Sequence, residues 1–260
     1  MTKLVLFEQV ADGIGLITLS RPEAANAMSV QLLTELGAIL DQVNRNPDIR
    51  VVLLTGAGQK AFCAGADLKE RQGMSNRQVK EIVQLIGVTV AKVEALAQPV
   101  IAAINGVAFG GGLELALACD LRIAATHAKV GLTETSLGII PGAGGTQRLP
   151  RLIGIEKAKE LIYTARRLHA EQAKSYGIVT YVYEDHELQE KTLQLAGEIA
   201  KNAPLALIQS KLAINQGVEV DLTTGLKIES LAYSALIPTK DRLEGLLAFQ
   251  EKRAPSYLGE

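Results

Sequence analysis

Short, continuous apolar runs alternate with longer stretches of helical spacing along most of this chain. Arg50–Thr55 (RVVLLT) and Pro99–Ile104 (PVIAAI) have the length of buried strands, and each is followed by a glycine-containing turn. Between them, Val30–Asn44 repeats apolar residues at the spacing of an amphipathic helix. Strands that alternate with helices favour parallel pairing through crossover connections. The alternation therefore predicts an α/β fold with a parallel sheet.

The same pattern predicts further strands and helices, and it stops near residue 203. The additional strands are expected at Gly15–Ser20, Leu121–Ala125 and Ile178–Tyr183. Long helical patterns occupy Gln78–Ala97 and Glu187–Asn202. We therefore expect a mixed α/β core that ends where the strands end.

The last part of the chain reads as three helices. Pro204 can begin the first, and Asp221 and Thr239 can cap the second and third. These helices offer more apolar surface than they can bury among themselves, which favours self-association. The predicted organisation is an α/β core at residues 1–203 that carries any active site, and a helical region at residues 204–260 that assembles copies of the chain.

Charge and composition exclude several classes of function. Lys and Arg together number 27 against 28 for Asp and Glu, so no excess of charge attracts nucleic acid or an anionic membrane. Aromatic residues make up only 4%, which disfavours a stacking surface for bases. No apolar stretch reaches the roughly 18 residues of a membrane span, and the N-terminus lacks the pattern of a targeting segment. We expect a cytoplasmic protein with no membrane partner.

Cysteine and histidine are too sparse for a disulfide framework or a metal centre. Cys63 and Cys119 both lie among apolar residues, so we expect reduced, buried thiols. The three histidines are not paired at a metal-binding spacing. The sequence therefore predicts no metal site.

A first candidate site is Ala61–Lys69 (AFCAGADLK), which follows the RVVLLT strand after a glycine-rich turn. Its small residues Ala64, Gly65 and Ala66 leave the main chain uncovered, so a ligand could reach the N–H groups directly. The alternative is a tight turn that only packs against the end of the strand.

A second candidate is Asn105–Glu114 (NGVAFGGGLE), where three glycines lead into an apolar helical pattern. A glycine-rich turn at the start of a helix presents unpaired N–H groups and the positive end of the helix dipole. Such a turn can bind a phosphate or stabilise a developing oxyanion. The segment lacks the Lys and Ser/Thr of a phosphate loop, and it does not match the dinucleotide-binding glycine pattern.

Two glutamates in apolar surroundings could supply acid–base chemistry. Glu114 lies in GGGLELALAC, and Glu134 lies in a second stretch flanked by glycine. An ionised carboxylate is costly to bury, so such a residue is paired, exposed or catalytic. Together they could act as acid and base on one substrate. Their separation in the sequence does not bring them together, and the alternative is two solvated glutamates at helix ends.

Four long motifs in a fixed order resemble the crotonase (enoyl-CoA hydratase/isomerase) superfamily over nearly the whole chain. They are SRPEAANAM, AFCAGADLKE, PVIAAINGVAFGGGLELALACD and LGIIPGAGGTQRLPRLIG. Three stretches, the first of which overlaps AFCAGADLKE, resemble the 3-methylglutaconyl-CoA hydratase group: CAGADLKER, KLAINQGVEVDLTTGL and IPTKDRLEGLLAF. The resemblance implies an α/β fold made of a crotonase-like spiral of repeated ββα units with a C-terminal all-helical oligomerisation region. It also implies fatty acid β-oxidation or leucine degradation as the setting.

The resemblance implies roles for four residues. The main-chain N–H groups of Ala66 and Gly111 would form an oxyanion hole for the thioester carbonyl. Glu114 and Glu134 would be the two acid–base residues, one activating the water that attacks C3 and the other supplying the proton to C2. The motifs do not assign which glutamate performs which step.

Binding of the coenzyme A (CoA) ester is implied for a larger set of residues. Lys252 matches a basic residue near the CoA phosphates that is often contributed by a neighbouring subunit. The alternative interpretation of Lys252 is an exposed lysine that is only solvated. The resemblance implies no metal and no cofactor, since CoA is part of the substrate. The implied substrate-binding residues are Ala24, Ala25, Ala64, Ala66, Asp67, Leu68, Lys69, Gly111 and Lys252.

Glutamate at both acid–base positions favours hydration over the other reactions of the superfamily. Isomerases of the family generally keep one acid–base carboxylate, and dehalogenases use an aspartate nucleophile. The main hypothesis is an enoyl-CoA hydratase that adds water reversibly and syn across the C2=C3 bond of a trans-2-enoyl-CoA. An enoyl-CoA isomerase or another crotonase-type reaction is the alternative. The expected assembly is a trimer or a dimer of trimers.

An RNA-binding protein is the non-enzymatic alternative, because a branch related to methylglutaconyl-CoA hydratases binds RNA through a lysine-rich first helix. The corresponding helix here, Val30–Asn44, contains no Lys or Arg but has Glu35 and Asp41. Contacts with phosphate supply most non-specific affinity for nucleic acids, so RNA binding is disfavoured.

Overall fold

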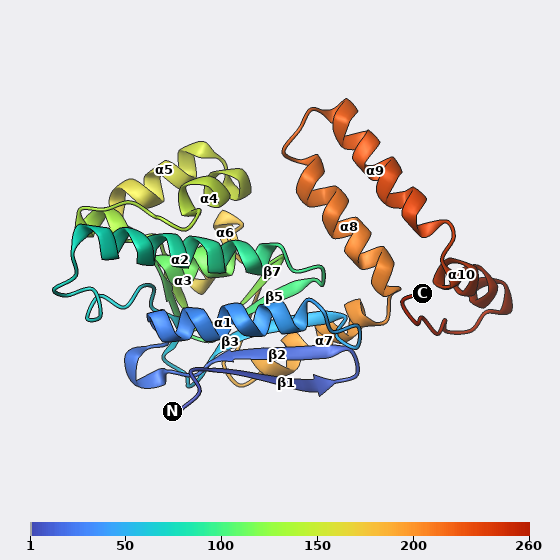
Figure 1. Ribbon diagram of the computed structural model, residues 1–260, viewed down its shortest axis with the longest axis horizontal. Helices are drawn as coiled ribbons and strands as arrows, with labels where there is room; N and C mark the ends of the chain where they lie inside the picture. Colours follow the sequence, from blue (N-terminus) through green and yellow to red (C-terminus); the bar gives the residue numbers. More distant parts are fainter. Residues whose placement is uncertain (1) are drawn as a thin grey trace.

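A six-stranded sheet forms the larger layer of residues 2–260, the part of the chain that the computed structural model describes. Its strand order is β1-β2-β3-β5-β7-β10, and the strands from β2 onward pair in parallel. At one edge β1 pairs antiparallel with β2. Figure 1 shows α1 and α2 lying across this layer. The bounds are β1 Val5–Ala11, β2 Ile14–Leu19, β3 Val51–Gly56, β5 Val100–Ile104, β7 Leu121–Ala125 and β10 Tyr181–Tyr183.

A second, smaller sheet has the order β4-β6-β8-β9, and only β8 and β9 are antiparallel. Three strands of the large sheet, β3, β5 and β7, each lead directly into a strand of the small one, and helices follow. This is the ββα repeat implied by the resemblance, so the predicted α/β class is confirmed. The bounds are β4 Ala61–Cys63, β6 Val107–Phe109, β8 Lys129–Gly131 and β9 Leu168–His169.

Helices occupy the connections, and several begin at the polar caps that the sequence offers. Ser29 caps α1 and accepts from the N–H of Leu32, and Ser75 with Gln78 forms a capping box at α2. Short 3-10 helices occupy η1 Pro22–Ala24 and η2 Glu134–Leu137. The helices of the core are α1 Val30–Val43, α2 Asn76–Glu94, α3 Gly111–Leu117, α4 Gly145–Ile153, α5 Ile155–Thr164, α6 Ala170–Tyr176 and α7 Leu188–Ala200.

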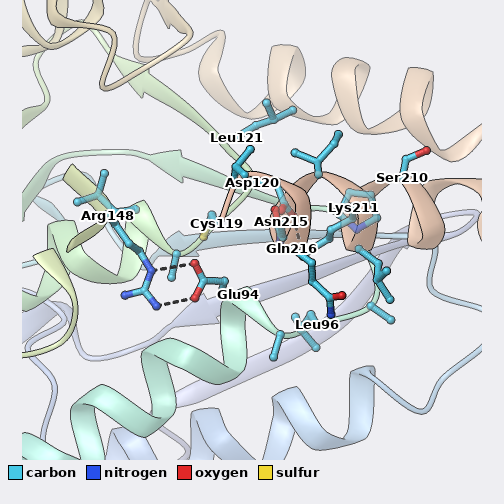
Figure 2. A pocket seen from close by; sticks show the side chains of 18 of the residues that line it. Glu94, Leu96, Cys119, Asp120, Leu121, Arg148, Ser210, Lys211, Asn215 and Gln216 are labelled. Carbon is cyan, nitrogen blue, oxygen red and sulfur yellow. Dashed lines mark hydrogen bonds and ion pairs between the residues drawn. The ribbon is translucent and has the colours of Figure 1, made fainter. Parts of the chain in front are cut away.

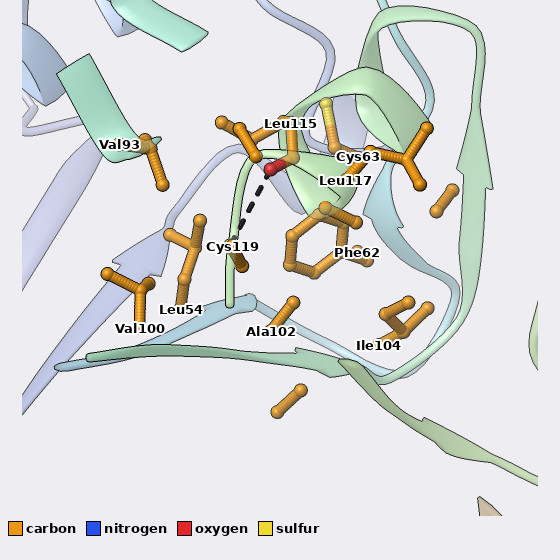
Figure 3. Packing of buried hydrophobic residues seen from close by; sticks show 14 of the residues in the cluster. Leu54, Phe62, Cys63, Val93, Val100, Ala102, Ile104, Leu115, Leu117 and Cys119 are labelled. Atoms are coloured by element: carbon orange, nitrogen blue, oxygen red, sulfur yellow. Dashed lines mark hydrogen bonds between the residues drawn. The ribbon is translucent and has the colours of Figure 1, made fainter. Parts of the chain in front are cut away.

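The core lies between the sheets and the helices, and both cysteines are part of it. Figure 3 shows Phe62 and Cys63 of β4 packed with side chains of β3, β5 and α3. Cys119 donates from its thiol to the carbonyl of Leu115, at 3.5 Å. Burial raises the pKa of both cysteine thiols to about 12, so they stay protonated. Both are free and buried, as expected.

The C-terminal helices extend away from the sheets, with α8 and α9 packed side by side and α10 beyond them (Figure 1). Asp221 and Thr239 cap α9 and α10 as the sequence predicts. One buried lysine ties α8 to the core, since Lys211 Nζ donates to Asp120 Oδ2 at 2.8 Å and to the carbonyl of Gln98 at 3.0 Å. The bounds are α8 Pro204–Gly217, α9 Leu222–Leu236 and α10 Lys240–Glu251.

The strand predicted at Ile178–Tyr183 is wrong in its first half, because only Tyr181–Tyr183 pair with β7. The N–H of Ile178 instead donates to the carbonyl of Ala173 and completes the end of α6. Gly177 permits this with a φ of +85°. Ile178 is buried all the same, which explains why its apolar run resembles a strand.

Candidate active site

Two glycine-containing loops meet at the start of α3. A Cβ atom added to Gly65 would lie 2.8 Å from the carbonyl oxygen of Phe109 and 3.4 Å from the nitrogen of Gly111. One added to Gly111 would lie 3.8 Å from the nitrogen of Ala66. Close approach and a φ of +99° both require glycine at position 65. The two N–H groups predicted for the oxyanion hole therefore lie together.

Both N–H groups are free to bind a ligand. Gly111 is the first residue of α3, where the N–H has no partner within the helix. Neither Ala66 nor Gly111 donates its N–H to an acceptor within residues 2–260. Two free donors beside one another at a helix N-terminus can bind a single oxygen that carries negative charge.

The N-terminal loop holds the Ala64–Ala66 segment in place. The N–H of Ala64 donates to the carbonyl of Ala25 at 3.0 Å, and the N–H of Met28 donates to the carbonyl of Gly65 at 2.8 Å. The structure thus brings Ala24 and Ala25 beside the loop that carries Ala66.

Asp67 shapes the turn that follows this loop. Its carboxylate accepts from the guanidinium of Arg21 at 2.6 Å and from the N–H groups of Lys69 and Glu70. Since these partners occupy the carboxylate, any contribution of Asp67 to binding the CoA ester would come from its main chain. Leu68 and Lys69 are exposed, so their side chains are accessible to a ligand.

Glu114 is held by main-chain donors from another loop. It lies in the first turn of α3 with 3% of its surface exposed. Its Oε1 accepts from the N–H groups of Ala143 and Gly145, both at 2.7 Å. Burial raises the pKa of Glu114, although these two donors and the charge of Arg148 oppose the shift. Glu114 therefore has one oxygen fixed by the protein and the other left for a ligand or a water.

Glu134 lies next to the start of α3 without an anchor of this kind. A Cβ added to Gly110 would lie 3.0 Å from Glu134 Oε1, which places the carboxyl one residue from Gly111. Its Oε2 is buried and has no hydrogen-bond partner within residues 2–260. Burial first, and then the negative charge of Glu114, raise the pKa of Glu134 to about 7.

The structure thus brings Glu114 and Glu134 together beside Gly111 and Ala66. The alternative of two solvated glutamates is wrong, since Glu134 is only 8% exposed and Glu114 is more buried still. The N–H groups of Ala143 and Gly145 that position Glu114 could not be recognised from side-chain types in the sequence. The PGAGG segment was the available signal, as a glycine-rich loop that leads into a helix.

Lys252 is not part of this cluster within one chain. It ends α10 in a left-handed conformation, with a φ of +54°. Figure 1 shows α10 well separated from α3, on the far side of α8 and α9. The predicted contact of Lys252 with CoA would require a second copy of the chain.

A groove of about 1140 Å³ lies elsewhere, between α8 and the core. Figure 2 shows Lys211 reaching into it from α8, and the ion pair of Arg148 with Glu94 on the opposite wall. None of the predicted site residues lines this groove.

In residues 2–260 no group of His, Cys, Asp and Glu could hold a metal ion. Over the same range, no helix combines the length and apolar character that crossing a membrane requires.

A spiral of ββα units with two free main-chain donors beside two buried carboxylates defines a crotonase-type enzyme. The chain belongs to the enoyl-CoA hydratase/isomerase family, whose model matches residues 9–260. It is an enzyme of the enoyl-CoA hydratase type.

Relatives and solved structures agree with this assignment. The Bacillus subtilis protein YngF is 58% identical, over 98% of both chains. Human mitochondrial methylglutaconyl-CoA hydratase is 49% identical over 97% of this chain and 76% of its own length. The crystal structure of an enoyl-CoA hydratase from Bacillus anthracis superposes with a TM-score of 0.98 at 57% identity, covering 99% of this chain and all of the other.

The raised pKa of Glu134 predicts a pH-dependent cost to stability. The folded protein holds the proton of Glu134 more tightly than the unfolded chain does. The resulting contribution to the free energy of unfolding is complete below pH 4.5 and is lost as the pH rises through about 7, because the buried carboxyl must then ionise. Glutamine is neutral throughout. We therefore expect Glu134→Gln to raise the melting temperature by several degrees, about 7 °C or more, at about pH 8 and by little at about pH 4.5. An equal difference at both pH values in calorimetry would contradict this.

Proposed function

We propose that the cluster of Ala66, Gly111, Glu114 and Glu134 performs the reversible syn hydration of a trans-2-enoyl-CoA. The observation that carries the proposal is the pair of buried carboxylates beside two unpaired N–H groups. Hydration needs a polarised thioester carbonyl, a water that loses a proton, and a proton for C2. The two N–H groups meet the first requirement, and the two glutamates meet the second and the third.

The N–H groups of Ala66 and Gly111 would both donate to the thioester oxygen. Addition of water at C3 moves an electron pair toward that oxygen and forms an enolate. Donors that are fixed beforehand stabilise this charge without reorganising, and one such donor is commonly worth about 3 kcal/mol of barrier. The N-terminus of α3 adds the positive end of its dipole.

The different surroundings of the two glutamates support different roles. Two N–H groups hold Glu114 at one oxygen, so its other oxygen can accept a proton from the attacking water. Glu134, with a pKa of about 7, is partly protonated at neutral pH and can give a proton to C2. Glu114 ends with one proton more and Glu134 with one fewer, and exchange with solvent restores both. The two carboxyls titrate as a coupled pair.

CoA is part of the substrate in this proposal, and no further cofactor takes part. The segments around Ala24, Ala64 and Leu68 would hold the CoA ester beside the oxyanion hole. A 3-methylglutaconyl group is a candidate acyl chain, supported by the name of the human relative that is 49% identical. Fatty acid β-oxidation and leucine degradation are the pathways that fit these substrates. A cytoplasmic location remains a prediction from the sequence.

Turnover of crotonyl-CoA tests the proposed reaction directly. Hydration removes the conjugation between the double bond and the thioester, so the absorbance of the conjugated thioester is expected to fall. An isomerase would instead leave crotonyl-CoA unchanged and would create that absorbance from a 3-enoyl-CoA. The second result would replace hydration with isomerisation at the same oxyanion hole.

We also propose that the helices from α8 onward assemble the chain into trimers, which can pair as hexamers. Large apolar side chains are exposed there, with Phe249 at 85%, and Leu222 and Leu231 above 70%. Exposure on this scale is typical of a surface covered by another chain. Assembly would also supply Lys252 to a neighbouring active site, in keeping with the separation of α10 from α3.

Removing the residues after Pro238 tests this assembly. We expect the full chain to form trimers or hexamers in light scattering, and the shortened chain to dissociate or precipitate because apolar helix faces lose their cover. A stable monomer of the full chain at micromolar concentration would contradict the proposal.

A further inference from the structure

The loop that positions Glu114 is itself held by a side chain, that of Arg148. Residues 142–145 are three glycines and one alanine, so their own side chains offer no polar group that could fix the loop. Glycine also leaves the backbone free to adopt many conformations. Arg148 Nη1 donates to the carbonyl of Ala143 at 2.8 Å, and the N–H of Ala143 donates to Glu114 Oε1 at 2.7 Å. Ala143 therefore connects the guanidinium to the glutamate.

Glu94, at the end of α2, fixes the guanidinium in turn. Its two carboxylate oxygens accept from Arg148 Nε at 3.0 Å and from Nη2 at 2.6 Å, which is a pairing through two parallel hydrogen bonds (Figure 2). Nη1 is then directed to the loop. A Cβ added to Gly144 would collide with Nη1, so the guanidinium packs directly against the loop. The Arg148 side chain is only 19% exposed, and its charge is therefore poorly screened by water.

The charges around Glu114 give Arg148 a second effect. The elements that pack most closely against α3 are α2, α4, β4 and β6. Of these, β6 has no titratable side chain, β4 contributes Cys63 as a protonated thiol, and α2 contributes Glu94, which is paired with Arg148. Glu134 adds a second carboxyl from η2, and its pKa is raised in part by Glu114. Arg148 supplies the positive charge that opposes the rise in the pKa of Glu114 on burial.

We propose that Arg148 is a positioning residue for the hydration, which fixes the loop that orients Glu114 and keeps Glu114 as the carboxylate that takes the proton from water. The inference rests on the proposed hydratase function and adds a residue that acts through Glu114. It also explains how two neighbouring carboxyls can have different roles, because their surroundings differ. Glu134 Oε2 has no hydrogen-bond partner within residues 2–260, whereas Glu114 has two N–H donors with a guanidinium behind them.

The pH dependence of kcat/KM for crotonyl-CoA tests the proposal, because its acidic limb reports the ionisation of the essential base in the free enzyme. Arg148→Met removes the charge and keeps a long, unbranched side chain. Without the positive charge the pKa of Glu114 rises further, so a higher pH is needed to ionise it. We expect the acidic limb to move up by roughly 0.5–1 pH unit. We also expect kcat at the optimum to fall about 10- to 100-fold, because the loop is less well fixed.

Two variants separate the charge of Arg148 from its ion pair. In Glu94→Gln, the amide oxygen can still accept a hydrogen bond from Arg148, and the guanidinium keeps its charge while the negative charge beside it is lost. We therefore expect the acidic limb to stay in place or to move down, opposite to its shift in Arg148→Met. Arg148→Lys keeps the charge without the planar fork of donors, so it should lower kcat and leave the limb near its original pH.

Arg151→Met is the matched control for the loss of one positive charge from α4. Arg151 pairs with Glu219 at 3.0 Å and its side chain is 55% exposed. Within residues 2–260 its other hydrogen bonds are to Gln147, and none reaches residues 142–145. We expect its acidic limb to be unchanged.

The double variant Glu94→Gln/Arg148→Met leaves no unpaired carboxylate and is the substitute if Arg148→Met does not fold. It should show the same upward shift of the limb. Circular dichroism and oligomer size establish that each variant is folded.

An acidic limb that stays in place in a folded variant without Arg148 would overturn the proposal even if kcat fell, because a purely structural loss lowers the rate without moving the limb. An equal upward shift in Glu94→Gln or in Arg151→Met would overturn it as well, since disruption of the pair or net charge would then be the cause. In these cases the unaltered enzyme still hydrates crotonyl-CoA, so the hydratase function stands. If the unaltered enzyme leaves crotonyl-CoA unchanged, the hydratase function itself fails, and the role of Arg148 in it fails too.

Discussion

Hydration of crotonyl-CoA is expected to slow by at least about 100-fold when either Glu114 or Glu134 is replaced by glutamine. In Glu114→Gln, the amide oxygen can still accept from the N–H groups of Ala143 and Gly145, so the loop keeps its anchor. The side chain can no longer take a proton from water. In Glu134→Gln, the side chain is as neutral as the protonated acid but cannot deliver a proton to C2.

Steady-state kinetics and binding of an unreactive CoA thioester separate chemistry from affinity in these variants. We expect kcat to carry the loss and affinity to stay largely the same, because neither carboxyl is proposed to hold the CoA portion. Glu190→Gln on α7 is the matched control, since Glu190 is exposed and far along the chain from the site. Near-normal turnover in either of the two site variants would remove that glutamate from the mechanism.

The sequence predicted the larger elements because their signals are local. Apolar spacing identified β3, β5 and α1, and the polar residues Asp221 and Thr239 marked the starts of α9 and α10. The small sheet gave no such signal, since its strands β4, β6, β8 and β9 have only two or three residues each. Pairing with distant strands defines these segments, and periodicity cannot detect runs of that length.

The site was predictable in its residue types and in the motifs that carry them, but not in its geometry. Glu114 and Glu134 stood out by their apolar neighbours, yet their approach depends on how α3 and η2 pack. Glu114 is held by main-chain N–H groups of Ala143 and Gly145, which have no side-chain signature in a sequence.

Gly111 offers the sharpest test of the oxyanion hole. It is the first residue of α3, so its N–H makes no hydrogen bond that the helix needs. Proline is well tolerated at the first position of a helix, where the N–H has no partner within the helix. Gly111→Pro therefore removes the proposed donor, but the ring also restricts Gly110, which has a φ of +52° and a ψ of −125°, so the turn can be disturbed as well. A Cβ at this position would come within 2.5 Å of Met28 Cε, so the flexible end of that side chain must move.

Gly111→Ala is the matched control, since it adds the same Cβ and keeps the N–H. We expect Gly111→Pro to lower kcat by about 10²–10³ relative to Gly111→Ala, the usual effect of losing one fixed donor to an oxyanion. Gly111→Val, which keeps the N–H but adds bulk beside the acyl group, should also damage catalysis more than folding. Circular dichroism and oligomer size must be normal for each comparison. If folded Gly111→Pro kept most of the rate, the thioester would be polarised elsewhere, and the role proposed for Ala66 would lose its support too.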